Sequence, residues 1–136
     1  MNRLPAWFAQ EIPDQVLLDR AGEAADAKVH TVCREAHCPN AAQCLKNRQS
    51  TFLILGQTCT RHCRFCAVQK ADSVGQAVDP REPGRVAALV KMWDLRYAVV
   101  TSVTRDDLAD GGAGQFCGVV KAIRELGGSR KIEVLV

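Results

Sequence analysis

Six of the seven cysteines in this chain fall into two groups of three, and each group occupies one short stretch of sequence. The first triplet has the spacing C-x4-C-x5-C, and the second triplet has the spacing C-x3-C-x2-C. The triplets consist of Cys33, Cys38 and Cys44, and of Cys59, Cys63 and Cys66. Clustered cysteines outside a secreted scaffold are typical of metal sites or catalytic groups. Because each triplet has to close around one centre, this feature constrains the fold of residues 33 to 66 more than any other.

Each triplet offers three thiolates, and that number separates two kinds of metal site. A structural zinc site is usually closed by four ligands. A cubic iron–sulfur cluster held by three cysteines keeps one iron free for another molecule, so the spacing predicts chemistry at an open iron. The alternative is a zinc site that adds His62 to the second triplet. A histidine directly before Cys63 would have difficulty reaching the same tetrahedral centre, so we expect His62 to be a solvated loop residue.

Length and composition limit the classes of function. The chain has 136 residues, which is one domain or part of one, and its 47% apolar and 24% charged residues are ordinary values for a soluble protein. A net charge of +3 is too small to indicate a nucleic-acid or membrane partner. Residues 1–10 lack the apolar run of a secretory signal, and no stretch approaches the roughly 20 apolar residues of a spanning helix. We therefore expect a cytoplasmic protein whose cysteines are reduced.

Apolar runs and helical periodicity alternate through the second part of the chain. The runs at 51–55 and 97–103 predict buried strands, and 131–136 predicts a third strand. Apolar residues recur at helical spacing in 83–93 and again in 116–126. The order strand, helix, strand, helix, strand predicts an α/β fold with parallel pairing and right-handed crossovers.

Two loops follow the first two predicted strands. The second triplet begins just after the first strand, and a polar loop follows the second strand. This polar loop contains Arg105, Asp106 and Asp107, followed by Gly111 and Gly112. In parallel α/β folds, functional groups gather at the C-terminal ends of the strands. We therefore expect the two loops to lie at one edge of the sheet.

Basic residues lie close to the cysteines. Arg61 and Arg64 lie inside the second triplet, and Arg48 lies between the two triplets. Positive charge lowers the pKa of a thiol and favours the thiolate that binds metal. We interpret these three arginines as charge that faces a cluster.

Other residues are expected to be structural. Cys117, next to Phe116 on the second helical stripe, is expected to be a buried thiol, and Met92 and Trp93 are expected to belong to the core. Residues 14–27 have weak helical character.

The second triplet resembles the signature of the radical S-adenosylmethionine (SAM) superfamily. The match rests on the C-x3-C-x2-C spacing after the first strand of a βα fold, with Phe65 at a position that is commonly aromatic. The resemblance implies that the unique iron binds the amino and carboxylate groups of SAM. It further implies that reduction of the cluster cleaves SAM to methionine and a 5′-deoxyadenosyl radical.

Longer segments are similar to the lipoyl synthase family, from about residue 30 to the last residue. The segments are VCREAHCPN at 32–40, TFLILG at 51–56, CTRHCRFCAV at 59–68, YAVVTSVTRDDL at 97–108 and DGGA at 110–113. A shorter match covers Glu82 and Pro83, and another covers 132–135. This resemblance implies a partial (βα) radical SAM barrel with the first three parallel strands and two helices. It is preceded by a cysteine-rich cluster-binding segment, so the expected division is 1–50 and 51–136.

The resemblance also implies an activity, cofactors and partners. A lipoyl synthase inserts two sulfur atoms, at C6 and C8, into an octanoyl chain carried on a lysine. The second triplet would hold the SAM-binding [4Fe-4S] cluster, and the first triplet would hold an auxiliary [4Fe-4S] cluster that provides sulfur. Arg105, Asp106 and Asp107 would face SAM or substrate. The implied partners are an octanoylated lipoyl carrier domain or glycine-cleavage H protein, and an electron donor such as flavodoxin or ferredoxin.

The sequence departs from the family pattern in one respect. In the family the auxiliary cluster takes a fourth ligand from a serine near the C-terminus, in an Arg-Ser-Ser-Tyr-like motif that is absent here. We therefore expect the chain to correspond to the first half of a lipoyl synthase and to be inactive alone. The alternatives are another radical SAM enzyme with an auxiliary cluster, and a non-catalytic iron–sulfur or zinc module.

Overall fold

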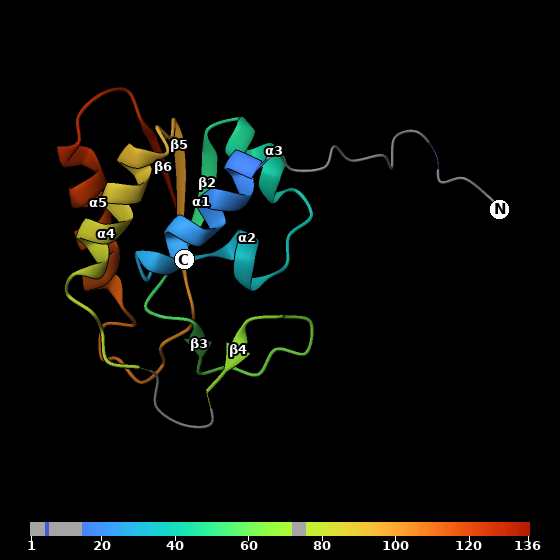
Figure 1. Ribbon diagram of the computed structural model, residues 1–136. Helices are drawn as coiled ribbons and strands as arrows, with labels where there is room; N and C mark the ends of the chain where they lie inside the picture. Colours follow the sequence, from blue (N-terminus) through green and yellow to red (C-terminus); the bar gives the residue numbers. More distant parts are fainter. Residues whose placement is uncertain (1–4, 6–14, 72–75) are drawn as a thin grey trace.

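The computed structural model describes residues 5, 15–71 and 76–136, and it forms a mixed α/β structure (Figure 1). In chain order the elements are α1 (Gln15–Asp26), β1 (His30–Thr31), α2 (Val32–Glu35), α3 (Ala41–Lys46), β2 (Gln49–Ile54), β3 (Thr58–Cys59), β4 (Gln69–Lys70), α4 (Glu82–Met92), β5 (Tyr97–Ser102), α5 (Ala113–Glu125) and β6 (Lys131–Leu135). Within these described ranges, no helix has the length and apolar character needed to cross a membrane.

The main sheet has the strand order β1-β2-β5-β6. Strands β2, β5 and β6 are parallel, with Gln49 beside Tyr97 and Tyr97 beside Lys131 at their starting ends. The three predicted strands and their parallel pairing are therefore confirmed. Strand β1 is antiparallel to β2, and β3 pairs with β4 in a separate two-stranded sheet. Neither pairing was predicted, because strands of two residues carry no periodic signal.

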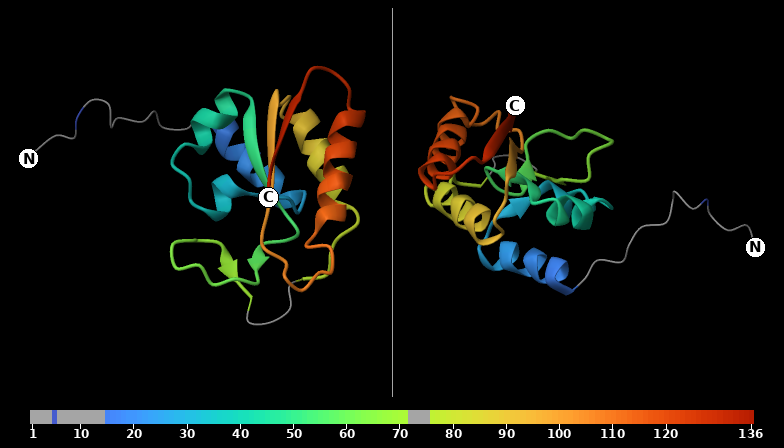
Figure 2. Two further views of the ribbon diagram at one scale, coloured as in Figure 1. Left: turned by 180° about the vertical axis from the view of Figure 1, so that it is seen from behind. Right: turned by 90° about the horizontal axis from the view of Figure 1, so that it is seen from above.

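Helices cover both sides of the main sheet. Helices α4 and α5 lie side by side against one face, whereas α2 and α3 lie on the other side (Figure 2). The apolar stripe predicted for 83–93 is confirmed, since its members are almost fully buried. They are Val86, Leu89, Val90 and Trp93. The indole ring of Trp93 stacks on Phe52 of β2, with ring centroids 6.2 Å apart.

Residues before the first parallel strand share the same core. Ala24 of α1 and Val29 after it are buried with residues of β2 and α4. The indole N–H of Trp93 also donates to the Glu23 carboxylate, at 2.7 Å. The weak helix predicted at 14–27 forms α1, and its C-terminal part packs against α4 through these contacts.

Two core predictions are wrong. The Met92 side chain is 56% exposed, and Cys117 is exposed on α5. Each lies one residue beside a buried position, next to Trp93 and Phe116 respectively. One residue is about 100° around a helix, so a neighbour in sequence points away from the buried stripe.

Candidate functional site

The chain changes direction sharply where β2 ends. Leu55 and Gly56 both have left-handed backbone conformations, with φ values of +69° and +94°. For a residue such as leucine this conformation costs about 1–2 kcal/mol. The Leu55 N–H donates to Oε2 of Glu82 at 3.1 Å, and the Leu55 carbonyl accepts from Nη1 of Arg105 at 3.3 Å. Buried side chains of opposite charge thus satisfy both backbone groups of the strained residue.

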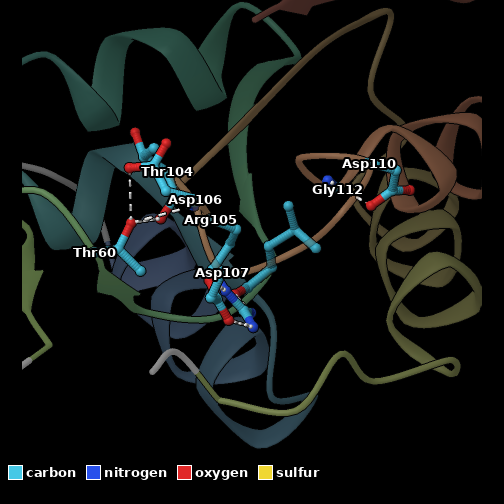
Figure 3. Close-up of polar contacts among 8 residues, drawn as sticks. Thr60, Thr104, Arg105, Asp106, Asp107, Asp110 and Gly112 are labelled. Atoms are coloured by element: carbon cyan, nitrogen blue, oxygen red, sulfur yellow. Dashed lines mark hydrogen bonds and ion pairs between the residues drawn. The ribbon is translucent and has the colours of Figure 1, made fainter. Parts of the chain in front are cut away.

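Each of these two side chains has a further partner. Gln115 of α5 donates to Oε2 of Glu82 at 2.7 Å. Arg105 makes two hydrogen bonds to Asp107, of 2.8 and 2.7 Å (Figure 3). The Asp107 carboxylate raises the pKa of the Arg105 guanidinium, so Arg105 keeps its charge although it is only 3% exposed. Each of the two side chains is therefore held by a second partner as well as by Leu55.

The Leu55 side chain lies against a glycine of the loop before α5. A Cβ atom added to Gly112 would lie 2.2 Å from Cδ1 of Leu55, which is closer than two carbons can approach. Gly112 also has a φ of +95°, a conformation that favours glycine. We call the group of Leu55, Glu82, Arg105 and Gly112 the Leu55 junction. It joins the end of β2 to the start of α4 and to the loop between β5 and α5.

The second triplet begins four residues after the junction. Cys59 lies in β3, opposite Lys70 of β4, and the Cys59 carbonyl accepts a hydrogen bond from the Ala71 N–H at 2.9 Å. The Cys66 N–H donates to the Cys63 carbonyl at 3.2 Å. The loop that carries the three cysteines is therefore closed at its base by the β3–β4 pair.

This cysteine loop is attached to the loop after β5. Thr60 donates to the Thr104 carbonyl from its backbone, at 3.2 Å, and from its hydroxyl, at 3.0 Å. Arg61 makes two hydrogen bonds of 2.9 Å to the Asp106 carboxylate. Figure 3 shows Thr60, Thr104 and Asp106 together. The expectation that the two loops meet at one edge of the sheet is thus confirmed.

The surroundings of Cys59 favour its ionised form. Partial burial acts to raise the pKa of this thiol. Hydrogen bonds from the backbone of Arg61 and Thr104, together with the Lys70 ammonium, outweigh burial and lower the pKa. A thiolate is the form of cysteine that binds metal, so Cys59 is suited to be a ligand.

The first triplet lies on α2, on the turn after it and on α3. Thr31 caps α2 by accepting the Arg34 N–H at 3.3 Å, and the Cys38 N–H donates to the Cys33 carbonyl at 2.9 Å. The pKa of Cys33 is raised, mainly by burial and further by the neighbouring thiols of Cys38 and Cys44. The α2 and α3 segments also contact β2, so this triplet lies beside the sheet.

The remaining predicted residues have varied surroundings. His62, Arg64 and Phe65 are exposed, and Phe65 is 93% exposed. Arg48 forms an ion pair with Asp94 at the starting end of β2, so it lies far from the second triplet along the sheet. Arg61 is paired with Asp106, as described above. The interpretation of these arginines as charge facing a cluster is therefore weakened for Arg48, which has a different partner.

The residues present fit iron–sulfur clusters by the chemistry of their donors. Iron–sulfur clusters are held by cysteine thiolates, and each triplet supplies three thiols within a single short segment. Beside Cys59, the ammonium of Lys70 is buried and has no hydrogen-bond partner among the residues that the structure describes, as expected where an anionic group is to be bound. In the part of the chain that the structure describes, no three Cys, His, Asp or Glu side chains converge on one position for a single metal ion.

Sequence reasoning missed two features of this site. Glu82 was interpreted as a helix start first and a site feature second, and its hydrogen bond with the Leu55 N–H was not predicted. No role was predicted for Lys70, because a single lysine after a cysteine loop forms no distinctive sequence pattern. The pairing of β3 with β4, which brings Lys70 beside Cys59, was not visible in the sequence.

The fold and the site define an α/β protein with two cysteine triplets, one of them on a loop at the C-terminal end of the first parallel strand. No protein-family model matches the chain. It is 48% identical over 136 residues to a lipoyl synthase of Geotalea daltonii, covering 100% of the chain and 46% of that relative. It is 51% identical over 133 residues to a lipoyl synthase of Pyrobaculum calidifontis, covering 97% of the chain and 45% of that relative. The corresponding values for a lipoyl synthase of Caldicellulosiruptor saccharolyticus are 52% over 111 residues, 82% and 38%.

These similarities identify the particular family. The chain belongs to the lipoyl synthase family. It spans about half the length of the curated relatives it matches.

Proposed function

We propose that this chain provides the cluster-binding part of a lipoyl synthase. The reaction is the radical SAM-dependent insertion of two sulfur atoms, at C6 and C8, into a protein-bound octanoyl-lysine. The observation that carries the proposal is the fixed cysteine loop, which is joined to the end of β5 through Thr60 and Arg61 and follows the Leu55 junction. Agreement with curated lipoyl synthases along the whole chain supports the same function.

The two triplets have different roles in this proposal. Cys59, Cys63 and Cys66 hold the [4Fe-4S] cluster that binds SAM, and Cys33, Cys38 and Cys44 hold the auxiliary [4Fe-4S] cluster. When bound, the clusters and SAM supply a radical that can abstract hydrogen from an unactivated carbon, together with the sulfur to be inserted. The three parallel strands and α4 and α5 form part of a radical SAM barrel, and residues 1–50 form the segment that carries the auxiliary cluster.

The other residues of the site act by positioning. The Leu55 junction sets the direction in which the chain enters the cysteine loop. Arg61 and Asp106 hold that loop against the end of β5, because their paired hydrogen bonds fix both distance and orientation. Arg105 and Asp107 were expected to face SAM or substrate. In this proposal Asp107 orients Arg105, and Arg105 supports the start of the cysteine loop through the Leu55 carbonyl.

The proposed partners follow from the proposed reaction. They are an octanoylated lipoyl carrier domain or glycine-cleavage H protein as substrate, and an electron donor such as flavodoxin or ferredoxin. A cytoplasmic location belongs to the same proposal, because thiols that bind iron–sulfur clusters need a reducing compartment.

Anaerobic reconstitution with iron and sulfide tests the assignment of clusters. We expect the iron content of two [4Fe-4S] clusters, and a change in the spectrum of one of them when SAM is added. Replacing the second triplet by alanines removes the cluster that responds to SAM, whereas replacing the first triplet leaves it. Cys117→Ala, at an exposed cysteine outside both triplets, is the matched control. Binding of zinc without visible absorbance would contradict the proposal.

The product tests the reaction. The reconstituted protein is incubated with an octanoylated carrier domain, SAM and a reductant, and the carrier is analysed by mass spectrometry. Because the chain spans about half the length of its curated relatives, we expect it to form no product alone. Lipoyl-lysine formed by this chain would establish the reaction and contradict that expectation. A different modification, formed while SAM is consumed, would indicate another radical SAM enzyme with an auxiliary cluster.

A further inference from the structure

A lysine lies beside the first cysteine of the second triplet. In the β3–β4 pair, Lys70 is the register partner of Cys59, and the Ala71 N–H next to it donates to the Cys59 carbonyl at 2.9 Å. The Lys70 side chain is thereby held next to the base of the cysteine loop. It comes from the strand that closes this loop, and its position is set by backbone pairing.

The second observation concerns the ammonium group of Lys70. Its nitrogen is buried, and among the described residues it makes no hydrogen bond. The two carboxylates of the adjoining loop are engaged elsewhere, since Asp106 is bound by Arg61 and Asp107 by Arg105. A buried charge without a counter-charge is costly. Among the described residues, no carboxylate is available to balance the charge of Lys70.

The anion that fits this position is the one that the second triplet would hold. A [4Fe-4S] cluster with three thiolate ligands carries net negative charge, and one-electron reduction makes it more negative. Lys70 lies opposite Cys59, the first cysteine of that triplet, in the β3–β4 pair. Arg61 is a weaker candidate, because its charge is already paired with Asp106 and its side chain is 61% exposed.

We propose that the Lys70 ammonium is the counter-charge of the iron–sulfur cluster on Cys59, Cys63 and Cys66, and that it raises the reduction potential of this cluster. The proposal rests on the proposed function, because it requires a cluster at the second triplet. The fixed positive charge stabilises the reduced cluster more than the oxidised one. An electron donor of given potential therefore reduces a larger fraction of the protein. Lys70 takes no part in bond making, and its role is to place a positive charge next to the cluster.

The potential of the cluster is the direct test. The reconstituted wild-type protein and its Lys70→Met, Lys70→Arg and Lys91→Met variants are titrated anaerobically with dithionite, and the cluster that responds to SAM is followed by electron paramagnetic resonance. We expect Lys70→Met to reduce the equilibrium constant for one-electron reduction at least tenfold, which is about 59 mV for one electron. Lys70→Arg keeps the charge and most of the potential. Lys91→Met, at an exposed lysine of α4, leaves the potential unchanged.

The outcomes distinguish the role of Lys70 from the proposed function on which it rests. Failure of the wild-type protein to load a cluster that responds to SAM would contradict the proposed function itself. A Lys70→Met variant that loads the same iron and has the wild-type potential would overturn the role of Lys70. If Lys70→Met loads no cluster, loading by Lys70→Arg supports a requirement for charge. Loss of the cluster in both variants overturns it, since packing alone would then explain the effect.

Discussion

Glu82 and Arg105 hold the same residue from opposite sides, because Glu82 accepts the N–H of Leu55 and Arg105 donates to its carbonyl. The two side chains come from α4 and from the loop after β5, yet each is almost completely buried. Through Leu55 they fix the point at which the chain leaves the sheet and enters the cysteine loop. The geometry of the second triplet therefore depends on residues far from it in the sequence.

Removing Glu82 tests this dependence. Glu82→Ala leaves the Leu55 N–H without its acceptor, while the Gln115 amide keeps only the Asp79 carbonyl. A buried unsatisfied group costs about 1–3 kcal/mol. We expect a loss of that size in the free energy of unfolding, measured by urea denaturation. Glu125→Ala, at an exposed position of α5, is the control and has little effect. Equal stability of the two variants would show that Glu82 does not support Leu55.

Gly112 is expected to tolerate no side chain. Gly112→Ala adds a Cβ atom 2.2 Å from Leu55 Cδ1 at a position with left-handed φ, so it strains both the loop and the junction. We expect destabilisation of more than about 1 kcal/mol by thermal or urea unfolding. The control is Gly22→Ala in α1, where nothing lies within 4 Å, and this change stabilises a helix by about 0.5–1 kcal/mol. The same sign of effect at both positions would contradict the close contact.

Asp110 is expected to contribute a pH-dependent part of the stability. Its carboxylate accepts the N–H groups of Gly114 and Gly112 at 2.9 Å each, and these hydrogen bonds lower its pKa from the ordinary value of 3.8. A lowered pKa in the folded state means that the contribution is complete above the unfolded value and is lost as the pH falls through the folded value.

Unfolding measured between neutral pH and about pH 2 checks this expectation. Asp110→Asn should lose stability relative to the wild type at neutral pH, and the difference should shrink below the unfolded pKa. Asp26→Asn, at an exposed residue of α1, serves as the comparison. A difference between Asp110→Asn and wild type that is constant with pH would refute the assignment.

The Arg61–Asp106 pair is expected to affect the cysteine loop more than the fold. Both side chains are more than half exposed, so their contribution to overall stability is small. Asp106→Asn should instead speed the loss of iron from the second triplet to a chelator, by up to about fivefold for an exposed ion pair. Asp94→Asn, which breaks the pair with Arg48 elsewhere on the sheet, should leave this rate unchanged.

Much of the fold was predictable because its signals are local. Apolar runs gave the three parallel strands, and the stripe from Val86 to Trp93 gave the buried face of α4. Met92 and Cys117 were assigned wrongly, since the limits of a helical stripe are set by packing partners that the sequence does not display. The pairing of β3 and β4 depends on contacts across the cysteine loop and has no local pattern.

The candidate site divides in the same way. Spacing identified both triplets, and the order of predicted strands and helices placed the loop that contains Asp106. The Leu55 junction could not be predicted, because it consists of hydrogen bonds between groups that are 27 and 50 residues apart. The left-handed conformation is unfavourable for a leucine on its own, and it is explained only by the hydrogen bonds that Leu55 makes in the folded structure.

The left-handed conformation of Leu55 also imposes an order of events on the making of the protein. Its two backbone partners lie later in the chain, and a turn that depends on distant partners closes only after the loops between them have closed. A nascent chain that has emerged only as far as Cys66 therefore lacks the contacts that aim its thiols. In the proposed function, loading of the cluster onto the second triplet is therefore a step that follows folding, and iron and sulfide have to be delivered to a chain that has already folded.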